Sequence, residues 1–186
     1  MSGDNGSRPA PGHAKRAGVR FAGYAAIFGR PDRGGDVVKA GAFAGSLRRR
    51  AAGSVPLLWQ HEPARPIGRV EYLKEDRRGL RVIARLSQGA AGREAAALLG
   101  EGAVRGLSFG YRVRRARGLD AVPGLRELVE LDLVEISLVT LPMQPKARVH
   151  ALEDGGGKGT RTRTCPRSGE RGHVQVRVPG GGGGLG

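Results

Sequence analysis

The stretch LRELVELDLVEISLVTLP, residues 125–142, decides the fold, because it is a long run of strand-forming residues that ends at Pro142. Successive side chains of a strand point to opposite faces. This alternation predicts one face that carries Leu131, Leu133, Glu135 and Ser137, and an opposite face that carries Asp132, Val134, Ile136 and Leu138. The pattern predicts either two strands or one bent strand, with Glu135 held among aliphatic residues.

Segments on the N-terminal side of this stretch have the same character. Short β-type runs predict strands at residues 19–29, 55–60, 67–76, 79–87 and 103–113, and DRRG between the third and fourth indicates a hairpin. Short helices are expected at residues 40–50, with arginines in the last turn, and at 91–102, closed by glycine. The expected fold is mainly β (α+β). Because most connections are too short for crossover helices, about six to seven strands are predicted to form an antiparallel β-barrel flanked by a few helices.

The length of 186 residues fits one domain with tails. Hydrophobic residues make up 39% of the chain and aromatic residues 4%, so the core must consist mostly of Val, Leu, Ile and Ala. Glycine, serine, proline and charge without periodicity predict a disordered N-terminal tail at 1–17 and a disordered, Gly/Arg-rich C-terminal tail at 153–186. The folded unit is therefore expected at 18–152.

The net charge of +15 favours a polyanionic partner, although a high-GC genome would also enrich arginine. Basic clusters at 48–50 and 112–117 lack interleaved aromatic residues of the kind that bind single-stranded nucleic acid. The single cysteine, Cys165, excludes an internal disulfide and fits a reducing, intracellular setting. We expect no secretory signal at the N-terminus and no membrane span. A non-catalytic, basic nucleic-acid-binding protein remains an open alternative.

Three residues in apolar runs have the chemistry of an activated-nucleophile hydrolase, namely His61, Ser108 and Glu135. His61 ends the apolar run VPLLWQ, where it is either a general base or a solvated strand-end residue. Ser108 lies on a strand face of Gly-Ser-Gly, which either admits another backbone, such as a substrate, or packs under a helix. Glu135 either orients a histidine or faces solvent, and Asp132 is the competing carboxylate on the opposite face. No G-x-S-x-G elbow is present, so the residues alone predict no more than a serine hydrolase.

Five ordered segments together resemble the prohead, or capsid-maturation, serine proteases of tailed phages and gene transfer agents, which are distantly similar to the herpesvirus assemblins. They are FAGYAAIFGRPDRGGDVVKAGAF, LLWQHEPARPIGRV, GLRVIARL, EGAVRGLSFGYRV and LVEISLVTLPMQPKARV. The resemblance covers about residues 20–149 and implies an assemblin-like β-barrel ringed by helices. It implies that His61 is the catalytic histidine, Ser108 the nucleophile and Glu135 the third member. Assemblins use a second histidine as third member, so His150 is the rival residue, and Asp132 remains another.

The resemblance also implies an activity and a setting. The expected function is a serine endopeptidase that cleaves the scaffolding segment of the major capsid protein precursor, and itself, inside the assembling procapsid in the cytoplasm of a bacterial host. A homodimer is suggested by analogy with assemblins. No cofactor, metal or membrane partner is expected, and a nucleic-acid contact would be non-specific. An oxyanion hole is required, and Arg105 is one candidate for it.

Overall fold

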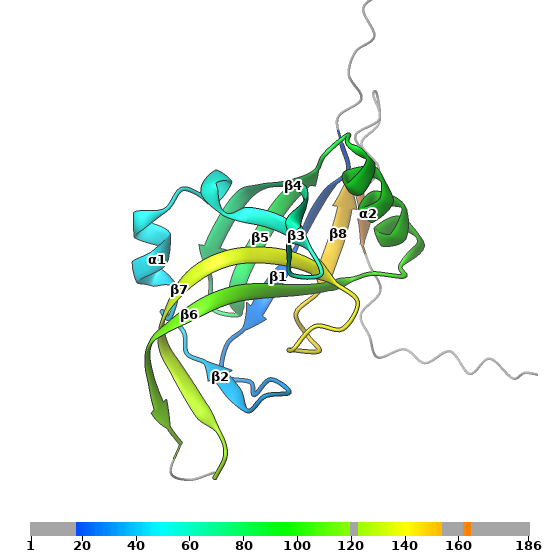
Figure 1. Ribbon diagram of the computed structural model, residues 1–186. Helices are drawn as coiled ribbons and strands as arrows, with labels where there is room; N and C mark the ends of the chain where they lie inside the picture. Colours follow the sequence, from blue (N-terminus) through cyan, green and yellow to red (C-terminus); the bar gives the residue numbers. More distant parts are fainter. Residues whose placement is uncertain (1–17, 120–122, 154–161, 165–186) are drawn as a thin grey trace, which may run out of the picture.

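The computed structural model describes residues 18–119, 123–153 and 162–164, and in these ranges the chain forms nine strands and two α-helices around one sheet (Figure 1). The strands are β1 (Arg20–Ile27), β2 (Asp36–Val38), β3 (Pro56–Trp59), β4 (Glu62–Glu75), β5 (Gly79–Leu86), β6 (Gly106–Gly118), β7 (Arg126–Val139), β8 (Val149–Glu153) and β9 (Thr162–Thr164). The helices are α1 (Ala44–Arg49) and α2 (Ala90–Glu101), with a 3₁₀ turn η1 at Ala52–Ser54. The predicted mainly β class with few helices is confirmed.

Several local predictions are confirmed in detail. The β4–β5 hairpin turns at Asp76, whose carboxylate accepts the N–H groups of Arg78 and Gly79. Helix α2 ends at Gly102, which adopts the left-handed conformation with φ of 79°. Arg48 and Arg49 occupy the last turn of α1, as expected from the helix dipole.

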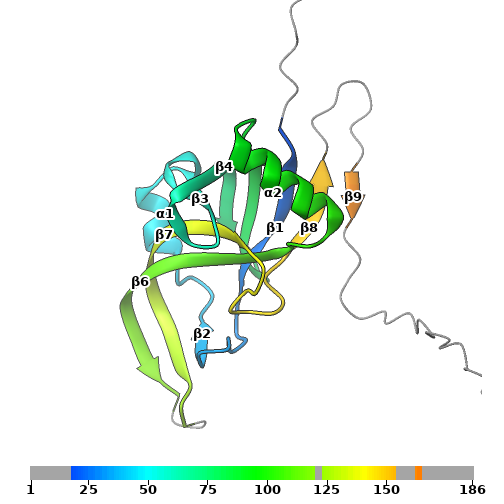
Figure 2. The ribbon, with the colours of Figure 1, turned by 45° about the vertical axis from the view of Figure 1, so that its right-hand side comes forward.

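Strand β7 organises the sheet, because it pairs with three other strands. It pairs with β6 along its whole length in antiparallel fashion, and with β2 and β3 in parallel fashion. From β3 the order continues through β4, β5, β1, β8 and β9 by antiparallel pairs. Figures 1 and 2 show β6 and β7 continuing beyond the body of the sheet as a long two-stranded arm.

The prediction of an antiparallel barrel is therefore confirmed only in part: most strand pairs are antiparallel, but the sheet is mixed. The two parallel pairs make the sheet mixed, and the strand order has two ends in the described residues. The prediction missed the parallel pairs because it considered only crossovers through one helix between neighbouring strands. In the structure 66 residues, from 60 to 125, separate β3 from β7. One isolated bridge, Gly106 with Arg148, connects the start of β6 to the residue before β8.

The stretch at 125–142 forms one bent strand, β7, and a bulge at Val134 makes its predicted faces wrong. Gly110 pairs with Glu135 and Tyr111 pairs with Leu133, so Val134 has no partner on β6. The extra residue reverses the alternation. Leu131 and Leu133 thus share the core face with Ile136 and Leu138, while Glu135 and Ser137 point to the other face.

The hydrophobic core includes Ala95 and Leu99 of α2, and Leu47 of α1 packs against it. Its largest fully buried side chains come from nearly every element: Phe21, Phe43, Leu57, Ile67, Leu80, Leu86, Leu99, Leu107, Leu128, Leu131, Leu133 and Ile136. Aliphatic residues dominate, as the composition predicted. No described helix has the length and hydropathy of a membrane span.

The predicted tails lie mostly outside the described residues, as does Cys165. Two described segments fall at or beyond the predicted end of the folded unit at 152. Strand β8 ends at Glu153, and the short strand β9, which belongs to the stretch predicted as a tail, pairs with β8. The alternating Thr-Arg-Thr sequence of β9 suits such a short edge strand.

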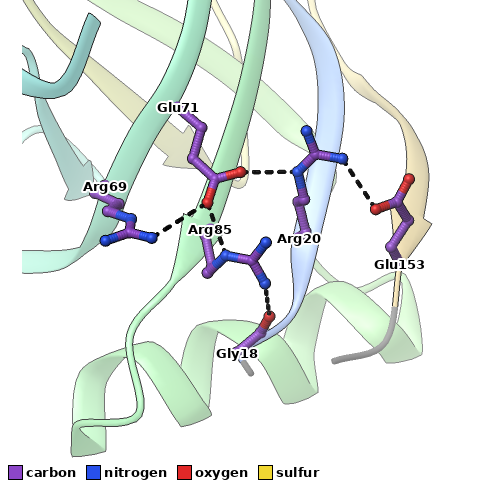
Figure 3. Close-up of polar contacts among 6 residues, drawn as sticks. All are labelled: Gly18, Arg20, Arg69, Glu71, Arg85 and Glu153. Carbon is purple, nitrogen blue, oxygen red and sulfur yellow. Dashed lines mark hydrogen bonds and ion pairs between the residues drawn. The ribbon is translucent and has the colours of Figure 1, made fainter. Parts of the chain in front are cut away.

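A cluster of partly exposed side chains around Glu71 connects four strands (Figure 3). The Glu71 carboxylate on β4 accepts hydrogen bonds from Arg20 on β1 (2.8 Å) and Arg85 on β5 (2.7 Å). Arg69 lies 3.6 Å away, and Arg20 also donates to Glu153 on β8. Burial would raise the pKa of Glu71, but the hydrogen bonds from Arg85 and Arg20 outweigh it and hold the pKa below its usual value.

We predict that Glu71→Gln lowers the free energy of unfolding by about 1 kcal/mol, the upper end for a partly exposed ion pair. Because the folded pKa is lowered, this contribution is present above the ordinary carboxyl pKa of about 4.3 and is lost as the pH falls through the folded pKa. Urea unfolding of both proteins at neutral and acidic pH measures it. Glu94→Gln, which removes a single exposed pair with Arg65, is the control and should change little. Equal losses in the two variants would show that the cluster adds nothing beyond an isolated pair.

Candidate active site

His61 lies in the tightest turn of the sheet. Strands β3 and β4 are joined by only two residues, Gln60 and His61, and Trp59 pairs directly with Glu62. Their φ angles are 49° and 63°, and among the described residues they alone are non-glycine with positive φ. A two-residue hairpin turn with positive φ at both positions normally takes Asn and Gly, and each strained residue costs on the order of 1–3 kcal/mol. The fold therefore holds His61 in a conformation that its sequence does not favour.

Contacts to β7 and the residue after it hold this strained turn in place. The Gln60 amide donates to Thr140 Oγ1 (2.6 Å) and accepts from the Thr140 backbone N–H (3.2 Å). The Gln60 backbone N–H donates to the Leu138 carbonyl (2.9 Å), and the His61 N–H donates to Ser137 Oγ (3.2 Å). The Gln60 side chain and the backbone N–H groups of both turn residues thus hold the turn against β7 and Thr140.

The imidazole of His61 meets the carboxylate of Glu135. His61 Nδ1 lies 2.6 Å from Glu135 Oε1, and Ser137 Oγ donates to Glu135 Oε2 at 2.6 Å. Glu135 is only 7% exposed, so each of its oxygens needs the partner it has. With Nδ1 as the donor, Nε2 of His61 is the nitrogen left to accept a proton.

The contact with Glu135 also sets the proton affinity of the imidazole. The hydrogen bond to Glu135 raises the pKa of His61 and outweighs the burial that would lower it. The side chain of His61 is 43% exposed, so solvent screens this pair. Because the folded pKa is raised, the pair stabilises the fold below the ordinary imidazole pKa, and this contribution is lost as the pH rises through the folded pKa.

Ser108 lies on the same face of the sheet as Glu135 and Ser137. It pairs directly with Ser137 across β6 and β7, next to the Gly110–Glu135 pair. Ser108 is 6% exposed, and its hydroxyl makes no hydrogen bond within the described part of the chain. Ser137 thus stands between Ser108 and the His61 backbone. Catalytic hydrogen bonds in unliganded enzymes are often long and tighten only when substrate binds.

The glycines that flank Ser108 make room for this chain rather than for a substrate backbone. A Cβ atom on Gly110 would lie 2.7 Å from Glu135 Oε1, and one on Gly106 would lie 2.4 Å from the Val139 carbonyl oxygen. The structure has the small-residue face that the sequence predicted. At Gly106 and Gly110, however, the space is filled by β7 and does not admit a substrate backbone. Gly110 is needed because the Glu135 carboxylate occupies the space of its missing side chain.

The competing residues lie in other environments. Asp132 binds Arg49 and Arg114, and the hydrogen bond from Arg114 is the main cause of its lowered pKa. The ring of His150, on β8, packs edge-on against Tyr24 at a centroid distance of 5.8 Å. The guanidinium of Arg105, the residue considered for the oxyanion hole, lies against Gly102 at the end of α2. Glu135 is thus the carboxylate that reaches His61.

Three residues of this site were not singled out from the sequence: Gln60, Ser137 and Thr140. For Ser137 a signal existed, because its spacing of two from Glu135 places both on one strand face. Gln60 and Thr140 act through a turn geometry that the Gln-His dipeptide does not indicate. No group of three or more His, Cys, Asp or Glu side chains in the described ranges could hold a metal ion.

The chain matches a protein family and curated relatives. A family model described as caudovirus prohead serine protease matches residues 10–158. The prohead protease of Enterobacteria phage HK97 is 31% identical over 140 residues, which cover 74% of this chain and 61% of the HK97 protein. The capsid polyprotein of Pseudomonas phage PAJU2 is 32% identical over 106 residues, 53% of this chain and 16% of that protein. The chain therefore spans less than two thirds of the length of either relative.

Solved structures share the fold at low sequence identity. The bacteriophage T4 capsid assembly protease has a TM-score of 0.55 and 13% identity, covering 66% of this chain and 81% of its own. The KSHV protease in complex with a hexapeptide phosphonate inhibitor has a TM-score of 0.52 and 13% identity, covering 71% of this chain and 64% of its own. At this identity the likeness concerns the fold.

We predict that His61 titrates above the ordinary imidazole value of about 6.5 and that Glu135→Gln lowers its pKa. The reason is that the neutral amide no longer favours the imidazolium ion. Side-chain NMR of labelled histidine across pH 5–9 measures both values. Asp132→Asn is the matched control and should leave the His61 titration unchanged. An ordinary pKa in the unmutated protein would contradict the contact seen here.

We predict that Ser137→Ala lowers the free energy of unfolding by about 1–3 kcal/mol, because it leaves a buried carboxylate oxygen and the His61 N–H without a partner. Ser46→Ala is the control. Ser46, on α1, is also buried, but its hydroxyl accepts only one hydrogen bond, from the backbone N–H of Leu133 on β7. Urea denaturation should give the smaller loss for Ser46→Ala, and the reverse order would refute the double role assigned to Ser137.

Proposed function

The chain belongs to the caudovirus prohead serine protease family, and on that premise we propose that it is a serine endopeptidase of capsid maturation. The family match agrees with the resemblance carried by the five ordered segments of the sequence. The observation that supports the activity most directly is the His61–Glu135 contact on a strained turn beside Ser108. Strained backbone that the fold actively holds is concentrated at functional sites.

In the proposed mechanism Ser108 Oγ attacks the scissile carbonyl, and Nε2 of His61 accepts its proton. Glu135 holds the imidazole with Nδ1 protonated and stabilises the imidazolium ion that forms. His61 then protonates the leaving amine, and water clears the acyl-enzyme. Since His61 must be neutral to act as a base, its raised pKa places the acidic limb of the pH–rate profile above about 6.5.

The proposed substrate is the scaffolding segment of the capsid protein precursor, and the protease itself by autoproteolysis. The name of the HK97 relative supports the prohead as the place of action, and the name of the PAJU2 relative supports a capsid substrate. The chain would act inside the assembling procapsid, in the cytoplasm of a bacterial host. A homodimer of the assemblin kind completes the proposal and can be tested by analytical ultracentrifugation. Whether the particle is a phage or a gene transfer agent does not alter the chemistry.

Two further parts of the proposal concern the fold and its ends. We propose that the sheet closes into a barrel between β6 and β8. The Leu107 N–H donates to the Ala147 carbonyl and the Val149 N–H to the Arg105 carbonyl, on either side of the Gly106–Arg148 bridge. These bonds join β6 to β8 and would complete the ring. We also keep residues 18–152 as the core of the catalytic unit, with tails at 1–17 and 153–186.

The alternative of a non-catalytic basic protein, in the capsid interior or on nucleic acid, is not favoured. Binding a polyanion requires exposed arginines but gives no reason to bury Glu135 or to strain the turn at His61. A DNA mobility shift that falls with salt and survives Ser108→Ala would measure any such binding independently of catalysis.

Ser108→Ala is expected to abolish processing when the chain is co-expressed with its capsid precursor, because loss of a serine nucleophile lowers turnover by on the order of 10⁶-fold. His61→Ala should have a comparable effect, since the two residues act as a unit. Precursor length on a gel, with masses of the products, is the measurement. Processing that survives both substitutions would overturn the proposal.

Glu135→Gln is expected to reduce the rate by roughly 10²–10⁴-fold, by analogy with aspartate substitutions in other triads. The acidic limb of the pH–rate profile should move down with the pKa of His61. Asp132→Asn, which removes a carboxylate that binds arginines instead, should retain activity. A full rate in Glu135→Gln would remove Glu135 from the catalytic group.

A further inference from the structure

A cavity of about 100 Å³ lies beside Ser108. Its walls come from β1, β2 and β6 and from the chain segments before β2 and after β7. Much of the surface is apolar and is supplied by Val38, Leu107, Phe109 and Met143. The cavity is thus lined by the proposed nucleophile together with side chains that can pack against methylene groups.

Most of the polar groups that line this cavity already have partners. The Gln144 amide is saturated by the backbone of Ile27 and Arg30. Tyr111 donates its hydroxyl to Asp36, and burial, with this bond, raises the pKa of Tyr111 to about 12, so it remains a donor. These groups shape the cavity without offering a free charge.

The carboxylates of the cavity are not fully compensated. Asp36 accepts hydrogen bonds from Nε and Nη2 of Arg126, each at 2.8 Å. Asp32 lines the cavity too, and its Oδ1 accepts only the backbone N–H groups of Gly34 and Asp36. In the described residues Asp32 forms no ion pair, so Arg126 neutralises Asp36 and leaves the charge of Asp32 without a cationic partner. In a chain of net charge +15 this wall is locally negative.

The negative end of the cavity lies away from Ser108. Asp36 meets the hydroxyl of Tyr111, which is three residues along β6 from Ser108, or roughly 10 Å at ~3.3 Å per residue. Asp32 is bonded to the backbone of Asp36 and therefore belongs to the same end. A side chain that enters beside Ser108 must be long to reach these carboxylates.

We propose that this cavity receives the side chain of the substrate residue whose carbonyl Ser108 attacks, and that it selects lysine or arginine there. The inference rests on the proposed function. A long aliphatic stem packs against the apolar walls, and its cationic head reaches the Asp32 carboxylate. Ser108 supports the assignment independently, because the residue is only 6% exposed, lines this cavity and makes no hydrogen bond from its hydroxyl in the described chain. A charged pocket next to the nucleophile is how serine proteases set specificity for this residue.

The test uses the full chain and its capsid precursor. Product masses from the co-expression locate the bond that is cut, and the residue on its acyl side should be Lys or Arg. Replacing that residue in the precursor by Met, which keeps the length and removes the charge, should slow processing by about tenfold or more. Replacing it by Glu should slow processing further.

Asp32→Asn tests the pocket itself. Asparagine keeps the oxygen that accepts the Gly34 and Asp36 N–H groups, so the turn should hold, while the preference for the basic residue over Met should fall by about tenfold. Asp76→Asn is the matched control. Asp76 accepts two backbone N–H groups in the same way at the β4–β5 turn, does not line the cavity, and should leave the preference unchanged.

The outcomes separate the two proposals. If the precursor is not cut, and its length is the same with the unmutated chain as with Ser108→Ala, the proposed function is refuted and this inference with it. Cutting after an uncharged or acidic residue refutes only the pocket assignment. A preference for basic residues that is the same in Asp32→Asn and in the unmutated chain also refutes it, because the charge of Asp32 would then have no part in selection.

Discussion

The bulge at Val134 is the constraint on which the site depends. Before it, β7 points Leu131 and Leu133 into the core; after it, Ile136 and Leu138 continue that core face. Without the extra residue, alternation would place Glu135 and Ser137 on the core side among Leu and Phe side chains, with no imidazole to meet the carboxylate. A buried, unpaired carboxylate would be strongly unfavourable there. One unpaired residue thus keeps the core continuous and turns the polar pair toward His61.

The same strand stabilises the strained turn that carries His61. Left-handed backbone at two adjacent non-glycine residues is unfavourable by itself, and four hydrogen bonds to residues 137–140 offset it. Parallel pairing of β3 with β7 brings the turn to this position, since Leu58 is opposite Ser137 and Trp59 is opposite Leu138. The parallel pair that the sequence did not indicate is therefore what delivers the histidine to the carboxylate.

Local signals in the sequence predicted the elements well, and long-range pairing explains what they missed. The hairpin at Asp76 and the glycine cap at Gly102 depend on backbone preferences of a few adjacent residues, so they could be read directly. His61, Ser108 and Glu135 stood out as reactive residue types in apolar runs, and the fold gathers them on one side of the sheet. Nothing in the sequence predicted the bulge at Val134, because valine is an ordinary strand residue. The three-residue strand β2 was missed for lack of length, and its parallel pairing depends on a strand 90 residues later.

The hydrogen bonds around Glu135 also explain why a carboxylate suits this position better than an imidazole. Glu135 accepts on both oxygens at once, from His61 Nδ1 and from the Ser137 hydroxyl. A neutral imidazole has one acceptor nitrogen, so a histidine in its place could satisfy only one of these two donors. The other donor, either the buried Ser137 hydroxyl or His61 Nδ1, would be left without an acceptor. The residue at 135 and the hydroxyl at 137 are therefore coupled, and a site built on a second histidine at 135 would have to change both.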